Sequence, residues 1–148
     1  MIERLINIDR RIIFLFVAMA VTVPLLAKFT LPVRTTKDVE SIFNKIDSLP
    51  DNSHVLIAFD YDPASKEELQ PMAEALLHHC YQKNVKVIGM TLSPGGTGLA
   101  VHAIESIGKQ YHKIKGTDFV FLGYKTGVEL VMINMGENIY SVFPEDFQ

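Results

Sequence analysis

The sequence predicts a mixed α/β protein, with one transmembrane helix near the N-terminus followed by a three-layer domain. Two observations predict this fold. Residues 12–27 carry no charge and are almost entirely apolar. Residues 37–134 alternate between amphipathic stretches of helical length and short apolar runs of strand length, which is typical of a parallel sheet with helices on its faces.

The charge of the chain is unevenly distributed. Residues 1–34 carry five basic and two acidic side chains, a net charge of +3, whereas the rest carries nine lysines and fifteen acidic side chains, a net charge of −6. An acidic domain argues against a nucleic-acid partner, because phosphates require a basic surface. The single cysteine, Cys80, excludes an intrachain disulfide and a zinc site built from several cysteines.

The apolar run 12–27 predicts a membrane anchor. As a helix it reaches about 24 Å, short of a hydrocarbon core of about 30 Å, but apolar sequence resumes after Lys28, so the predicted span covers 12–31. Arg4, Arg10 and Arg11 place residues 1–11 in the cytoplasm by the positive-inside rule. Residues 32–36 are then a linker, and the domain 37–148 lies outside the cytoplasmic membrane of a single-pass, signal-anchored protein.

Two other interpretations of this run remain open. A cleaved signal peptide has the same basic start and apolar centre, although small residues are missing where cleavage would require them. A buried core helix is the other, although no amphipathic stripe is visible.

The first three predicted elements of the domain are a helix, a strand and a second helix. The apolar positions of 37–49 repeat at helical spacing, in Val39, Ile42, Phe43, Ile46 and Leu49. The continuous apolar run 54–60 suits a strand buried on both faces. The next helix covers 65–83, with one apolar face made of Leu69, Met72, Ala73, Leu76 and Cys80.

The second half continues the alternation. We expect a strand over 86–92, a helix over 99–113 and a strand over 118–124. The run 128–134 predicts a fourth strand, which forms a hairpin with the third. Right-handed crossovers then favour a Rossmann-like, mostly parallel sheet of order 2-1-3-4 with an antiparallel edge strand. No helix is predicted after that strand, so we expect the chain to be a piece of a longer protein.

Three loops follow the predicted parallel strands and meet at one edge of the sheet, where open α/β sheets bind their ligands. The candidate ligand-binding residues there are Asp60, Asp62, Ser93, Gly95, Gly96, Thr97 and Lys125. The glycine-rich loop 93–98 could bind a phosphate on backbone N–H groups at a helix N-terminus. It matches neither the dinucleotide-binding nor the P-loop pattern, and the alternative is a simple turn.

The Asp60-Tyr-Asp62 motif resembles the acidic pair of haloacid-dehalogenase-type phosphatases. That resemblance implies a nucleophilic Asp60, a proton-transferring Asp62 and a magnesium ion held by carboxylates. Pro63 and Ala64 stand where those enzymes have Gly-Thr, and no acidic pair follows a later strand. The other interpretation is that both carboxylates cap the following helix.

No metal site or cofactor is predicted. His78, His79 and Cys80 are adjacent, but neighbouring side chains on a helix point about 100° apart, whereas a helical zinc pair requires i, i+4 spacing.

The chain also resembles a family of uncharacterised bacterial membrane proteins with a single anchor and a Rossmann-like domain. The matching stretches are Asp9-Arg-Arg11, Phe59-Asp-Tyr61, Pro71-Met-Ala-Glu-Ala-Leu-Leu77, Lys86-Val-Ile88, Phe121-Leu-Gly-Tyr-Lys125 and Pro144-Glu-Asp-Phe147. The resemblance implies topology and a continuation beyond the last stretch, and it assigns no activity to any residue.

We therefore expect a binding or assembly component of a membrane complex rather than an enzyme. Its expected partners are the lipid bilayer and a membrane protein. The alternative is a hydrolase of phosphate esters or nucleotides that uses Asp60, Asp62 and the 93–98 loop.

Overall fold

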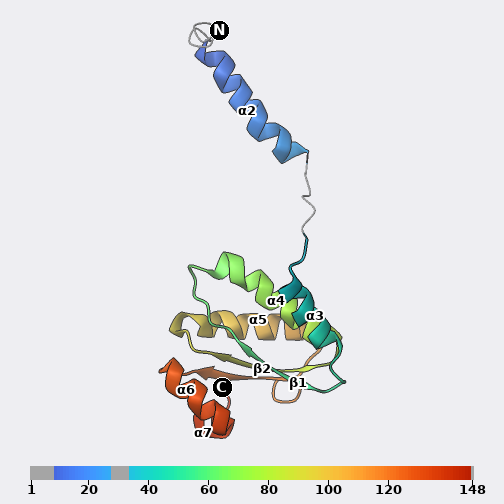
Figure 1. Cartoon of the computed structure of the whole chain (residues 1–148), viewed down its shortest axis with the longest axis vertical. Helices are drawn as coiled ribbons and strands as arrows, with labels where there is room; N and C mark the ends of the chain where they lie inside the picture. Colours follow the sequence, from blue (N-terminus) through green and yellow to red (C-terminus); the bar gives the residue numbers. More distant parts are fainter. Residues whose placement is uncertain (1–8, 28–33, 148) are drawn as a thin grey trace. The chain divides into compact units, whose positions relative to one another are not determined.

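The computed structural model of the chain describes residues 9–27 and 34–147. The chain divides into two compact units, Met1–Thr36 and Lys37–Gln148. Figure 1 shows the helices and strands of both units and labels helices α2 to α7 and strands β1 and β2.

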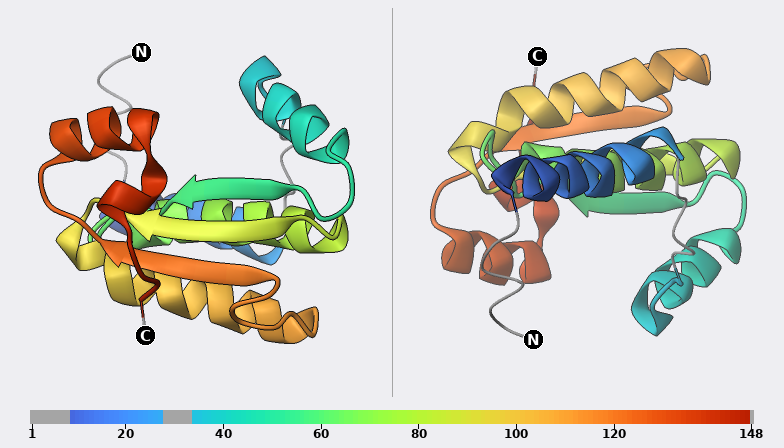
Figure 2. Two further views of the ribbon diagram at one scale, coloured as in Figure 1. Left: turned by 90° about the horizontal axis from the view of Figure 1, so that it is seen from below. Right: turned by 90° about the horizontal axis from the view of Figure 1, so that it is seen from above.

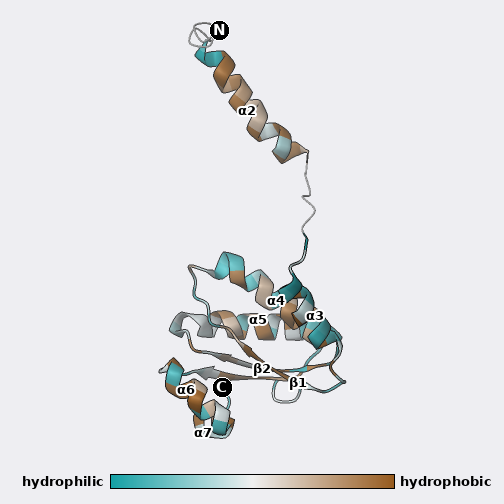
Figure 3. Cartoon of the chain, in the orientation of Figure 1, coloured by the Kyte–Doolittle hydropathy of each residue, from teal (hydrophilic) through white to brown (hydrophobic). Residues whose placement is uncertain are grey.

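The first unit contains helix α2, Arg10–Leu26, which is apolar along most of its length (Figure 3). Asp9 caps its N-terminus, where the carboxylate accepts a hydrogen bond of 2.9 Å from the backbone N–H of Arg11. The helix contains Pro24 and ends at Leu26.

The predicted anchor is not found in the structure. Within residues 9–27 and 34–147, no helix is long and apolar enough to cross a membrane. The prediction required the helix to continue from Ile12 through Lys28 to Leu31, but α2 has 17 residues, or about 25 Å, and ends before Lys28. Residues 28–31 of the predicted span lie outside the described residues. The transmembrane helix, the signal anchor and the cell-membrane localisation were therefore wrong.

The second unit is a parallel sheet with helices on both faces. Its elements are α3 Lys37–Asp47, β1 His54–Ala58, α4 Lys66–Gln82, β2 Lys86–Thr91, the short 3-10 helix η1 Pro94–Gly96, α5 Thr97–Gln110, β3 Phe119–Tyr124, α6 Val128–Glu137 and α7 Ile139–Val142.

The three strands are parallel and lie in the order β1-β2-β3, so β2 is central and β1 is an edge strand. The predicted order 2-1-3-4 was wrong. Helices α4 and α5 both cover the same face of the sheet (Figure 2), so the two right-handed crossovers move in the same direction and place the strands consecutively. The 2-1-3 order would need the two crossover helices on opposite faces.

The predicted antiparallel strand over 128–134 was also wrong, because these residues lie in α6. Gly127, with a φ of 80°, turns the chain away from the sheet before the helix starts. Val131 then packs with Met90 and Phe143 on the face opposite α4 and α5. A short apolar run does not distinguish a strand from a helix that buries one side, and here only Val131 of α6 is buried.

The main core lies between the sheet and helices α4 and α5. Its completely or almost completely buried members include Phe59, Leu77, Cys80, Val87, Ala103 and Ile104. Cys80 belongs to this core, so the sulfur is a packing group and the chain has no exposed thiol among the described residues.

Cys80 gives the stability of the unit a defined pH dependence. Burial raises the pKa of the Cys80 thiol to about 11, whereas an unfolded cysteine titrates near 8.5. The folded chain keeps this proton when the unfolded chain has lost it, so the free energy of unfolding should fall by about 1.4 kcal/mol per pH unit from roughly pH 8.5 upward. Urea unfolding at pH 8 to 10 measures the slope. Cys80→Ala should unfold with no such slope, and an equal slope in that variant would contradict the assignment.

Candidate functional site

The predicted ligand loops do meet at the carboxyl edge of the sheet. A Cβ atom placed on Gly96 would lie 2.7 Å from the carbonyl oxygens of both Phe59 and Tyr61, and one on Gly95 would lie 3.3 Å from Cβ of Asp62. The glycine-rich loop therefore packs directly on the chain that leaves β1. Its glycines allow this close approach of two backbone segments.

Asp60 joins the ends of two strands. Its Oδ1 accepts a hydrogen bond of 2.6 Å from the backbone N–H of Leu92. Beside it, the buried hydroxyl of Thr91 donates to the carbonyl of Phe59 at 2.9 Å and accepts from the N–H of Ser93 at 3.1 Å. These bonds connect the carboxyl ends of β1 and β2 and give Asp60 and Ser93 structural partners.

Asp62 is folded onto the turn that precedes α4. Its Oδ1 accepts hydrogen bonds from the Ser65 hydroxyl at 2.8 Å and from the backbone N–H groups of Ala64 and Ser65, each at 3.0 Å. The hydrogen bonds from the Ser65 hydroxyl and backbone hold the pKa of the Asp62 carboxyl below its usual value. These bonds lie in the turn before Lys66, the first residue of α4, and Asp60 bonds to Leu92 instead, so the interpretation that both carboxylates cap this helix was wrong.

The remaining candidates lie nearby. The backbone N–H of Lys125 donates to the carbonyl of Thr91 at 3.3 Å, and its ammonium lies 5.6 Å from the centre of the Phe143 ring. Thr97 is the first residue of α5. The structure thus brings the seven candidates to one edge. Asp60 and Asp62 accept hydrogen bonds from different parts of the backbone. Ligand binding by the seven candidates stays a prediction.

The histidines next to Cys80 point to different neighbours. The Nδ1 of His78 lies 3.1 Å from the hydroxyl of Tyr111, whereas the ring of His79 stacks on Phe43 with 4.4 Å between ring centres. Among the residues that the structure describes, no group of three or more His, Cys, Asp or Glu side chains could hold a metal ion.

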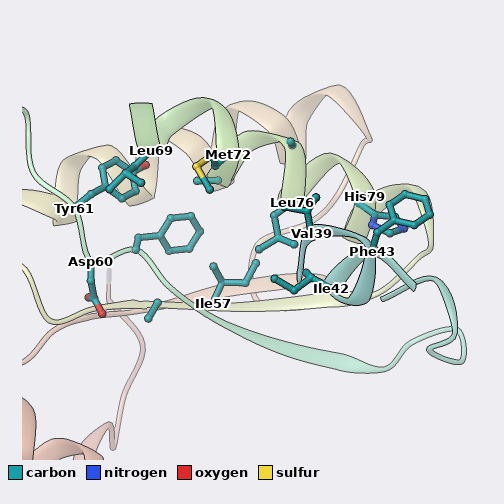
Figure 4. Close-up of a pocket in the computed structure, with 14 residues that line it drawn as sticks. Val39, Ile42, Phe43, Ile57, Asp60, Tyr61, Leu69, Met72, Leu76 and His79 are labelled. Atoms are coloured by element: carbon teal, nitrogen blue, oxygen red, sulfur yellow. The ribbon is translucent and has the colours of Figure 1, made fainter. Parts of the chain in front are cut away.

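An apolar groove that the sequence did not predict lies beside β1. It lies between α3, β1 and α4 and has a volume of about 530 Å³ (Figure 4). Helices α3 and α4 contribute Val39, Ile42, Phe43, Leu69, Met72, Ala73, Ala75, Leu76 and His79, and the chain from β1 onward contributes Ile57, Ala58, Phe59, Asp60 and Tyr61. We call this the α3–β1–α4 groove.

The groove exists because α3 buries only Ile46, near its C-terminal end. Ile46 is buried, whereas Val39, Ile42 and Phe43, on the same apolar stripe, are each half exposed. The stacking of Phe43 on His79 and an ion pair of 3.4 Å between Asp47 and Lys83 hold α3 against α4. The sequence contained this stripe, but the pattern does not distinguish a core-facing stripe from one that lines an open groove.

A second cavity of about 690 Å³ adjoins the groove along β1. The two cavities share Ile42, Ile57, Ala58 and Leu76, and the second adds Ser41, Lys45, Ile46, Leu49, His54, Val55 and Leu56. The edge strand β1 is therefore bordered by two apolar cavities.

Comparison of the chain with known protein families, with curated proteins and with solved structures finds no match. The resemblance to a family of anchored bacterial proteins stays a prediction.

Proposed function

We propose that the unit Lys37–Gln148 is a protein-binding domain and that an apolar segment of a partner protein occupies the α3–β1–α4 groove. The observation that carries this proposal is the exposure of the groove's apolar lining. Ile42, Phe43 and Met72 are each more than half exposed around one cavity. Folded proteins seldom expose contiguous apolar side chains in a groove unless the groove binds a partner.

The polar groups of the groove favour a protein segment over a small molecule. Sites for small molecules orient their ligand with a few converging polar groups. Here the carboxylate of Asp60 bonds to the backbone of Leu92, and the hydroxyl of Tyr61 donates to the side chain of Gln70 at 2.6 Å. What the groove offers a ligand is mostly apolar surface, which suits apolar side chains from another chain. The proposal retains the binding role that the sequence predicts, and it does not include the predicted membrane complex.

Ile42→Glu tests the proposal, because a carboxylate on an exposed position puts charge into the groove without disturbing the core. Leu130→Glu is the matched control: Leu130 lies on α6 outside the groove and is 67% exposed, against 56% for Ile42. The probes are three fluorescent, capped peptides: one alternates valine and alanine between terminal lysines, one is an amphipathic leucine–lysine helix, and one is a glycine–serine chain. Binding to the full chain is followed by anisotropy.

At least one of the two apolar peptides should bind more tightly than the glycine–serine peptide. Ile42→Glu should weaken that binding tenfold or more, and Leu130→Glu should leave it unchanged. If neither apolar peptide binds better than the glycine–serine chain, or if both variants weaken binding equally, the groove is not a protein-binding site.

A further inference from the structure

Given a protein-binding groove, we infer that its occupant is an extended segment that adds to the sheet as a fourth strand beside β1. This inference rests on the proposed function and specifies the conformation and chemistry of the partner. The backbone of β1 and the placement of the two cavities carry it.

The backbone of β1 has one free side. Lys86 donates its N–H to the carbonyl of Ser53, and Phe59 donates its N–H to the carbonyl of Met90, each at 2.8 Å. Alternate residues of a strand direct their backbone groups to the same side, so Val55 and Ile57 also face β2. His54, Leu56 and Ala58 therefore direct their N–H and C=O groups away from β2, and no strand of the described chain pairs with them. Such an edge is a template for another strand.

The side-chain space fits the same occupant. Successive side chains of a strand point to opposite faces of the sheet. A strand placed beside β1 would send one of these two sets of side chains toward α3 and α4, where the α3–β1–α4 groove and the adjoining 690 Å³ cavity provide apolar space. A helix in the groove would leave the backbone groups of Leu56 and Ala58 unpaired, whereas a strand pairs them and uses both cavities.

The length of β1 and the charge of the domain define the segment further. The three outward-facing residues of β1 span about 13 Å, so the occupant needs about five extended residues. The alternate residues that face α3 and α4 should be apolar, because mostly apolar side chains line both cavities. Residues 37–148 carry a net charge of −6, and Asp60 lies at one end of the groove, so we expect basic residues beside the apolar ones.

Residue-resolved amide exchange of the full chain, with and without the valine–alanine peptide, tests this inference. The amides of Leu56 and Ala58 should exchange at least tenfold more slowly when the peptide is bound. The amides of Val55 and Ile57 already bond to β2 and serve as controls in the same strand. Two further peptides carry N-methyl groups on one or the other alternate set of backbone nitrogens. One of them should bind at least tenfold more weakly, and the other should bind like the parent.

The outcomes separate this inference from the proposed function. If the peptide binds and Ile42→Glu weakens it, but both methylated peptides bind normally and Leu56 and Ala58 exchange unchanged, the groove binds its partner without strand addition. If the peptides do not bind at all, the proposed function fails first. If Leu56 and Ala58 are already protected in the free chain, with protection that rises with concentration, a second copy of the chain occupies the edge and the inference is wrong.

Discussion

Gly96→Ala is expected to lower the melting temperature of the domain by roughly 10 °C. A Cβ at this position would lie 2.7 Å from the carbonyl oxygens of Phe59 and Tyr61 and 2.8 Å from Oγ1 of Thr91. Two of these atoms belong to the backbone, which the bond from Leu92 to Asp60 holds in place. Relief of the clash must separate the glycine-rich loop from β1, and overpacking of this kind costs about 3 kcal/mol.

Gly98→Ala is the matched control, because it lies two residues away in α5 and its Cβ would meet nothing within 4 Å apart from its chain neighbours and the nearby backbone of its own helix. Alanine is the better helix former, so this variant should be as stable as the wild type or gain up to about 1 kcal/mol. Thermal unfolding followed by circular dichroism compares the two. If Gly96→Ala melted within 2 °C of the wild type, the loop would not be packed on β1, and a phosphate-binding role for it would regain support.

Much of the order of elements was predictable from local sequence. The alternation between helical and strand spacing placed α3, β1, α4, β2, α5 and β3 close to their observed positions. It also placed the loops after the three strands at one edge of the sheet, because parallel strands end on the same side. These features depend on periodicity and connection length, which a single sequence contains.

The errors concern features that depend on tertiary contacts. Strand order depends on which face each crossover helix covers, and the apolar patterns of α4 and α5 do not say which face that is. Whether 128–134 forms a strand or α6 depends on Val131 having Met90 and Phe143 to pack against. The predicted ligand residues illustrate the same limit: Asp62 follows a strand, as a catalytic acid could, but Ser65 is close enough to hold it in a turn.

Helix α4 shows why the groove was missed. The sequence predicts one apolar face through Leu69, Met72, Ala73, Leu76 and Cys80. In the structure Leu77, Cys80 and Tyr81 are buried, whereas Met72 is exposed beside the groove. The helix packs on both the sheet and α5, so its buried face is rotated relative to the predicted one, and one edge of the apolar stripe is left to line the groove.

Leu77→Ala should therefore destabilise the domain strongly, whereas Met72→Ala should leave its stability almost unchanged. Leu77 is 0% exposed in the core between the sheet, α4 and α5, so its truncation removes apolar burial and leaves a cavity, at an expected cost of about 3 kcal/mol. Met72, on the same helix, is 61% exposed, and its truncation should change the free energy of unfolding by less than about 0.5 kcal/mol. Urea unfolding of both variants measures the difference.

The effects of the two substitutions on peptide binding should be the reverse of their effects on stability. Met72→Ala removes apolar surface from the groove, so it should weaken binding of the valine–alanine peptide severalfold while the domain stays fully folded. Leu77→Ala does not touch the groove lining, so under conditions where it is folded it should bind the peptide like the wild type. A Met72 variant that lost stability as Leu77→Ala does would mean that α4 buries the face that the sequence predicts, and that the groove is closed in solution.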